Sequence, residues 1–172
     1  NGNLLFQQSI VEAEPVGAFR EGDQPLMSVI PSFKPQSYYS HITGITTAQP
    51  GFPSESFTVK NPKIEGVVRP LVYKIDSSVG ADVEAAVKAK MGRMFANAIS
   101  YTITLPTWRK PDGGLWKPNE IITVHSHTAM IYLTTPFLIR SVTLNATKDV
   151  RTATLTLVLP GAFSGQIPER LP

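Results

Sequence analysis

The spacing of apolar residues changes once along this chain, and this change constrains the fold more than any other feature. Between about Gly80 and Ser100 the apolar residues recur every three or four positions, which predicts an amphipathic helix. After this segment polar and apolar residues alternate, which predicts four strands, at 101–105, 121–125, 137–145 and 152–159. The sequence therefore predicts a β-rich α+β fold, a tube-like β-barrel or sheet domain with one long packed helix.

The predicted helix carries its apolar side chains on one side, at Val83, Val87, Met91, Met94, Phe95 and Ala98. Such a stripe is expected to pack on a sheet or barrel, because a helix must bury its apolar face. Three residues near its start have side chains suited to capping the first turn: Ser77, Ser78 and Asp82. The sequence leaves the choice among these three caps open.

The first 66 residues predict an irregular, loop-rich β segment. Short β-prone runs occur at 4–6, 27–30 and 38–46. Prolines such as Pro31 confine any strands here to the edges of a sheet or interrupt them, because proline has no N–H to donate to a sheet. A second unit opens near Val67 with the strand-like run at 71–73. We therefore divide the chain into a loop-rich β segment (1–66), a helix-plus-β-barrel domain (67–165) and a tail (166–172).

Composition excludes several classes of function. The 16 basic and 13 acidic residues give a net charge of +3, too weak and too scattered for a nucleic-acid footprint. The absence of cysteine excludes a disulfide scaffold and thiolate metal sites. No apolar run approaches the roughly 20 residues that span a bilayer. The opening Asn-Gly-Asn has neither a start methionine nor a signal pattern, so we expect a fragment of a longer protein.

Candidate catalytic and metal-binding residues are few. His125 and His127 are two positions apart, with Glu120 nearby, and on a strand the two imidazoles would point to one side. A metal site needs further ligands at a recognisable spacing, so we favour a solvated or hydrogen-bonding role. The run at 161–165 only superficially resembles a Gly-x-Ser-x-Gly nucleophile elbow. We predict no cofactor, no metal and no catalytic residue.

The segment from Trp108 to Asn119 is the most informative stretch. Its Pro-Asp-Gly-Gly is turn chemistry, and Leu115 and the two tryptophans, Trp108 and Trp116, are expected to anchor the flanks in the core. An alternative is a β-rich module that binds carbohydrate or nucleic acid through the tryptophans and their basic neighbours, Arg109, Lys110 and Lys117. We favour core anchors, because both tryptophans border predicted strands.

Several motifs follow one another in order along residues 67–163: Arg69-Pro70 before an apolar strand, the alanine-rich helix, Trp108, Gly113-Gly114, Leu115-Trp116, Pro118-Asn119, and an ending that contains Phe163. This order resembles the Mu-like baseplate hub proteins, which are related to the late-control D proteins of contractile-tailed phages. Thr107 departs from the family pattern, which has glycine before the first tryptophan. The resemblance extends only loosely to residues 3–57.

The resemblance implies a structural protein and not an enzyme. It implies a homotrimeric ring with tube-like β-barrel domains, seated between the tail tube and the central spike, with the 1–66 segment in an adjoining hub domain. The implied partners are other copies of the chain and the tube and spike proteins. DNA enters only as passing cargo, and no membrane is involved. The implied location is the virion tail of a phage, or a phage-like particle such as a tailocin, assembled in the bacterial cytoplasm.

The predicted strands carry little charge that would discourage pairing with another chain. We therefore take the polar face of the final strand as the candidate interface, at Thr152, Thr154 and Thr156. The module that binds ligand through Trp108 and Trp116 stays as the alternative function, and a wall hydrolase domain is a third.

Overall fold

The structure is a computed structural model that describes residues 9–48, 50, 53–75 and 82–164. The elements of this part of the chain are, in order, β1 (Ala18–Arg20), β2 (Ser28–Phe33), the 3-10 turn η1 (Pro35–Ser37), β3 (His41–Ile45), β4 (Ser56–Lys60), β5 (Pro70–Lys74), α1 (Val83–Ala98), β6 (Ile99–Leu105), β7 (Ile121–Ser126), β8 (Ile131–Ala146) and β9 (Arg151–Val158). The β-rich α+β class is confirmed.

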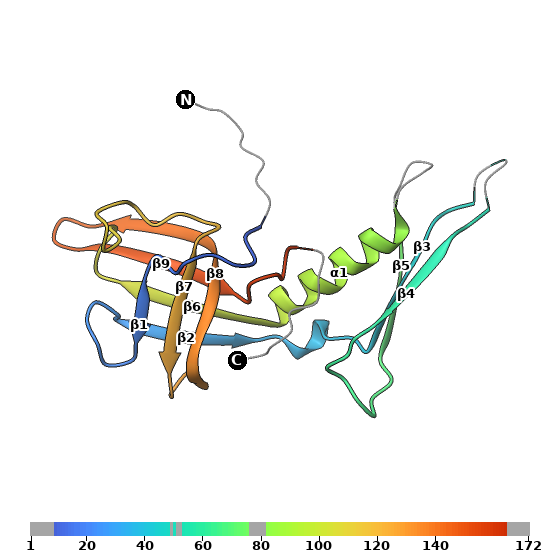
Figure 1. Cartoon of the computed structure of the whole chain (residues 1–172), viewed down its shortest axis with the longest axis horizontal. Helices are drawn as coiled ribbons and strands as arrows, with labels where there is room; N and C mark the ends of the chain where they lie inside the picture. Colours follow the sequence, from blue (N-terminus) through green and yellow to red (C-terminus); the bar gives the residue numbers. More distant parts are fainter. Residues whose placement is uncertain (1–8, 49, 51–52, 76–81, 165–172) are drawn as a thin grey trace.

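The strands form two sheets, and α1 lies between them (Figure 1). The large sheet has the order β1-β7-β8-β9-β6-β2, and the small sheet has the order β4-β3-β5. Pairing in the large sheet is antiparallel except between β1 and β7. The order of its described strands has two ends, at β1 and β2, so the observed form is the predicted sheet and not a closed barrel.

The two sheets do not follow the predicted division at residue 66. Strands β1 and β2 come from the first 66 residues and join the large sheet, whereas β5 follows residue 67 and pairs with β3 in the small sheet. Pairing between strands far apart in the chain leaves no mark in local periodicity, so the sequence pattern did not indicate it. The three-part division of the chain stays a prediction.

The predicted helix is confirmed as α1, and the structure identifies its cap. The Asp82 side chain accepts a hydrogen bond from the Ala85 N–H at 2.9 Å. The other candidate caps, Ser77 and Ser78, lie outside the described residues, as does the β-prone run at 4–6. Ile99 has extended backbone, so α1 ends there and the chain enters β6 directly.

The four predicted strands are confirmed as β6, β7, β8 and β9. The hairpin between β8 and β9 is closed by the Thr147 N–H, which donates to the Val150 carbonyl at 2.8 Å. Pro31 lies in β2, an edge strand, as its missing N–H predicts. Pro136 lies where β8 pairs with β7 alone, because the pairing of β8 with β9 begins at Leu138.

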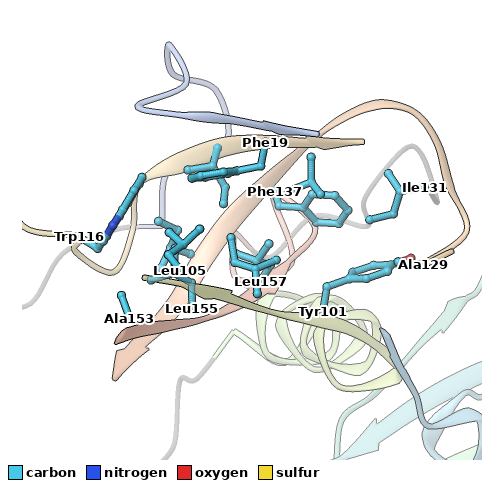
Figure 2. Close-up of a cluster of buried hydrophobic side chains, with 14 of the residues drawn as sticks. Phe19, Tyr101, Leu105, Trp116, Ala129, Ile131, Phe137, Ala153, Leu155 and Leu157 are labelled. Atoms are coloured by element: carbon cyan, nitrogen blue, oxygen red, sulfur yellow. The ribbon is translucent and has the colours of Figure 1, made fainter. Parts of the chain in front are cut away.

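The large sheet curls around one core, because side chains from β7 and β8 meet those of β6 and β9 (Figure 2). The Tyr101 and Phe137 rings pack edge to face with centroids 5.0 Å apart. Trp116 and Phe19 fill one end of this core, and Ala129 and Ile131 fill the other. The core therefore combines residues from most of the chain.

A second core joins α1 to the small sheet. Its buried members are Ile42, Ile75, Val83, Val87, Met91, Met94 and Phe95. Gly44 of β3 allows the helix to approach closely, because a Cβ at this position would lie 2.6 Å from Ile75 Cδ1 and from Val87 Cγ2. The apolar stripe of the helix is thus buried mainly against β3 and its neighbours, while Ala96 packs against the large sheet.

Candidate assembly surface

The predicted interface residues lie on the outer face of the large sheet. Strand β9 lies between β6 and β8, so both of its backbone edges are already paired. Alternate residues of β9 point into the core, and Thr152, Thr154 and Thr156 point to the other side, where they are half-buried. The face of β9 is therefore available for contact, whereas its edges are not.

The same polar face continues across four strands in register. One row runs from Ile30 through Thr102 and Thr156 to Ser141. The next row runs through Ser28, Thr104, Thr154 and Thr143. We call these eight residues, together with Thr152, the threonine face. It contains no charged residue, and its most apolar position is Ile30 on the edge strand β2, which is 58% exposed.

The joined ends of β7 and β8 form a tip, which we define as residues 125–136. The tip lies at the lower side of the large sheet in Figure 1. Val124 pairs with Thr135 and Ser126 with Ile131, so residues 132–134 of β8 lie opposite His125 alone. Such a bulge redirects side chains, and here Tyr132 and Leu133 are 61% and 78% exposed. The tip therefore presents large apolar side chains to solvent.

Glu21 fastens the turn of this tip to the segment that follows β1. Its carboxylate accepts hydrogen bonds from the Thr128 hydroxyl, from the Thr128 N–H at 3.1 Å and from the Ser126 hydroxyl at 2.9 Å. These bonds, the one from the Thr128 hydroxyl first, lower the pKa of Glu21 below its ordinary value. The turn is thus held in place by an ionised carboxylate.

We expect the Glu21 contact to make the tip sensitive to acid. A carboxyl whose folded-state pKa is lowered contributes stability that is fully present above its unfolded-state pKa and is lost as the pH falls through the folded-state pKa. Urea unfolding at neutral pH and near pH 3 should therefore show a smaller acid-induced loss of stability in Glu21→Gln than in the wild type. Glu12→Gln, at an exposed position, is the control. Equal acid sensitivity in all three proteins would contradict this assignment.

The two histidines contact each other and Tyr132 through their rings. The His125 and His127 rings pack edge to face with centroids 5.0 Å apart, and the His127 ring also packs against Tyr132. Glu120 instead binds Lys110 at 2.8 Å. Among the described residues there is no group of three or more candidate ligands.

The tryptophan segment divides into a buried part and an exposed part. Trp116 is 4% exposed and packs in the main core, and Trp108 is partly buried against the same core. The Trp108 indole N–H donates to the carbonyls of Asn145 and Thr152, both at 3.0 Å. Leu115 is 44% exposed, so its expected role as a core anchor is wrong. It follows a tight turn in which Gly113 has a positive φ of 86°.

The basic residues of this segment are largely engaged within the chain. Lys110 binds Glu120 and Asp112, and the hydrogen bond to Glu120 is the main cause that raises the pKa of Lys110. Arg109 donates to the Gly113 carbonyl at 2.6 Å. Arg151 lies over the Trp108 ring, beside an open hollow of about 400 Å³. Because Trp116 is buried and the Trp108 ring is already stacked, this geometry does not favour the alternative of a ligand platform.

The other motif positions hold local structure together. Arg69 donates to the carbonyls of Pro35 and Gln36, at 3.1 and 2.6 Å, and so ties η1 to the start of β5 at Pro70. Asn119, which follows Pro118, accepts a hydrogen bond from the Ile10 N–H at 2.8 Å. The Phe163 ring lies under the Arg140 guanidinium. Structural roles for these residues stay our interpretation of their contacts.

The fold is shared with phage tail proteins. The tail protein from Neisseria meningitidis MC58 superposes with a TM-score of 0.74 at 16% identity, over 91% of this chain and 48% of that one. The 43 kDa tail protein of prophage MuSo2 from Shewanella oneidensis superposes with a TM-score of 0.68 at 19% identity, over 92% of this chain and 45% of that one. At these identities the likeness establishes the fold alone.

A relative in sequence is more specific. The chain is 32% identical to baseplate hub protein gp44 of Escherichia phage Mu over 77 residues, which are 44% of this chain and 20% of gp44. No family model matches the sequence. The resemblance to Mu-like baseplate hub proteins, which the motifs predicted, is confirmed. The matched parts span less than half of each of these proteins.

Sequence reasoning placed the threonines of β9 on one face but missed the tip. The signal was present, because residues 129–139 contain no charged residue and include a run of four large apolar side chains, Met130, Ile131, Tyr132 and Leu133. The exposure of this run depends on the bulge, which alternation alone does not reveal.

No helix within the described ranges has both the length and the apolar character needed to cross a bilayer.

Proposed function

We propose that this chain is part of the baseplate hub of a contractile phage-like tail. In this role it forms a homotrimeric ring that joins the tail tube to the central spike. The observation that carries the proposal is the 32% identity with hub protein gp44 over 77 residues. The fold shared with two phage tail proteins over about nine-tenths of the chain supports it. The function is structural rather than catalytic, and the location is the virion tail.

The large sheet suits a role in a ring wall. Within the described part of the chain, this sheet ends at β1 and β2, and the backbone groups on such edges must be paired, covered or protected with charge. The threonine face offers a wide uncharged surface, and we propose that Thr152, Thr154 and Thr156 contribute to the contacts of the ring. In an assembled ring, neighbouring copies would extend these open sheets into the tube-like wall that the resemblance implies.

Two measurements test this proposal on the full-length protein. Light scattering at micromolar concentration should give three times the mass of one chain, and mass spectrometry of purified particles should detect the protein in the tail fraction. A strictly monomeric protein that is absent from the particles would contradict the hub and favour the ligand-binding module.

A charge on the threonine face tests the contribution of β9 within the same experiment. Thr154→Glu should weaken the trimer, because it places a carboxylate on an uncharged surface. Thr58→Glu, on the exposed face of the small sheet, is the matched control and should leave the mass unchanged. A trimer that tolerates both changes would remove β9 from the interface and leave the hub proposal standing.

A further inference from the structure

We infer that the tip of one copy docks on the β2 edge of the threonine face of a second copy of this chain. The proposal rests on the proposed ring and identifies its two contact surfaces. The first copy contributes Tyr132 and Leu133 of the tip. The second copy contributes Ile30 on β2, with the threonines of β6 and β9 beside it, and we call this surface the acceptor.

The tip is built to contact another surface. Among the described strands, residues 131–137 of β8 have no partner on the β9 side, because the pairing with β9 starts at Leu138 and β9 ends at Val158. The bulge directs Tyr132 and Leu133 outward, while Ile131 stays buried in the core. The Glu21 carboxylate holds the adjoining turn through Thr128 and Ser126. The exposed apolar side chains of the tip therefore lie next to a turn that hydrogen bonds hold in place.

The acceptor has the complementary features. Strand β2 ends the large sheet, so its outer edge has no partner among the described strands. Ile30 is exposed in register with Thr102, and Thr102 is in register with Thr156. Exposed Met27 lies just before β2. The acceptor is thus an apolar edge beside a wide polar face.

The lack of charged residues in the tip and in the acceptor favours a second copy of this chain as the partner that binds them. Neither residues 26–33 nor residues 126–136 contain Asp, Glu, Lys or Arg. Neither segment therefore brings an ionised side chain of its own into the interface, whereas a charged partner surface would lose its hydration against either side. Each chain also carries both surfaces at different places. Such a head-to-tail contact is the kind that closes into a ring when the rotation permits.

Side chains rather than backbone must provide most of the contact. Pro31 lies within the β2 edge and Pro136 within the open part of β8, and neither has an N–H to donate. A continuous ladder of hydrogen bonds between the two edges is therefore interrupted on both sides. Substitutions of the exposed apolar side chains should consequently have large effects on association.

The test uses the full-length protein and its self-association measured by analytical ultracentrifugation. We expect Leu133→Glu and Ile30→Glu each to raise the dissociation constant at least tenfold, because each buries a carboxylate in an apolar contact. Val72→Glu, at an exposed apolar position on the small sheet, is the matched control and should leave association unchanged. Unchanged circular dichroism and melting temperature would show that the variants fold.

A mixing experiment and a charge swap distinguish this contact from a general loss of stability. A mixture of Leu133→Glu and Ile30→Glu should form dimers but no ring, because only one intact tip and one intact acceptor remain per pair. The double variant Leu133→Lys with Ile30→Glu should recover association. A ring that persists in both single variants would overturn this inference alone. If both single variants still form the ring but no longer bind another tail protein, the tip contacts that protein instead. A monomeric wild type would overturn the proposed ring as well.

Discussion

Replacing Trp116 with alanine is expected to destabilise the protein by about 3–5 kcal/mol, the range for truncating a large buried aromatic side chain. Trp116 fills one end of the main core, with its ring centroid 5.7 Å from that of Phe19. A Cβ on Gly17 would lie 3.1 Å from the indole, so the site is closely packed. Chemical denaturation followed by circular dichroism measures the loss.

Two further variants test whether the Trp116 effect comes from buried volume. Trp116→Phe should cost less than Trp116→Ala, because the indole nitrogen is buried without a hydrogen-bond partner among the described residues and phenylalanine keeps much of the ring. Leu115→Ala, at the exposed neighbouring position, should change the free energy of unfolding by no more than about 0.5 kcal/mol. An indole at position 116 that acrylamide quenches freely would contradict this assignment.

Phe95→Ala is expected to destabilise the contact between α1 and the small sheet by about 3–5 kcal/mol. The Phe95 ring is fully buried and packs edge to face on Tyr38, with centroids 5.3 Å apart. Its loss leaves a cavity between the helix and the segment that leads into β3. Amide hydrogen exchange should therefore rise more in β3 and β5 than in β9, whose core lies in the large sheet.

Arg93→Ala is the matched control for Phe95→Ala, because Arg93 lies on the same helix and is exposed. It should leave both the free energy of unfolding and the exchange of β3 nearly unchanged. If Phe95→Ala accelerated exchange equally in both sheets, the two cores would unfold as one unit, and the local effect proposed for this residue would be wrong.

Local patterns predicted the elements that depend on neighbours in sequence. The helix stripe at Val83, Val87 and Met91 identified α1, and alternation identified β6 to β9. The turn chemistry of Gly113 and the edge position of Pro31 were also predicted, because both follow from the backbone properties of single residues. The resemblance to hub proteins came from the order of such local motifs.

The sequence by itself determined α1, the strands β6 to β9 and the family resemblance, since periodicity, turn residues and motif order are properties of adjacent positions. Only the tertiary structure decided which of the described strands lie at the edges of the sheets. It placed β1 and β2 at the ends of the large sheet, made β9 an interior strand and exposed Leu133 through a bulge. Pairing between distant strands is chosen by packing across the whole chain, and the exposure of one side chain depends on which strands lie beside it.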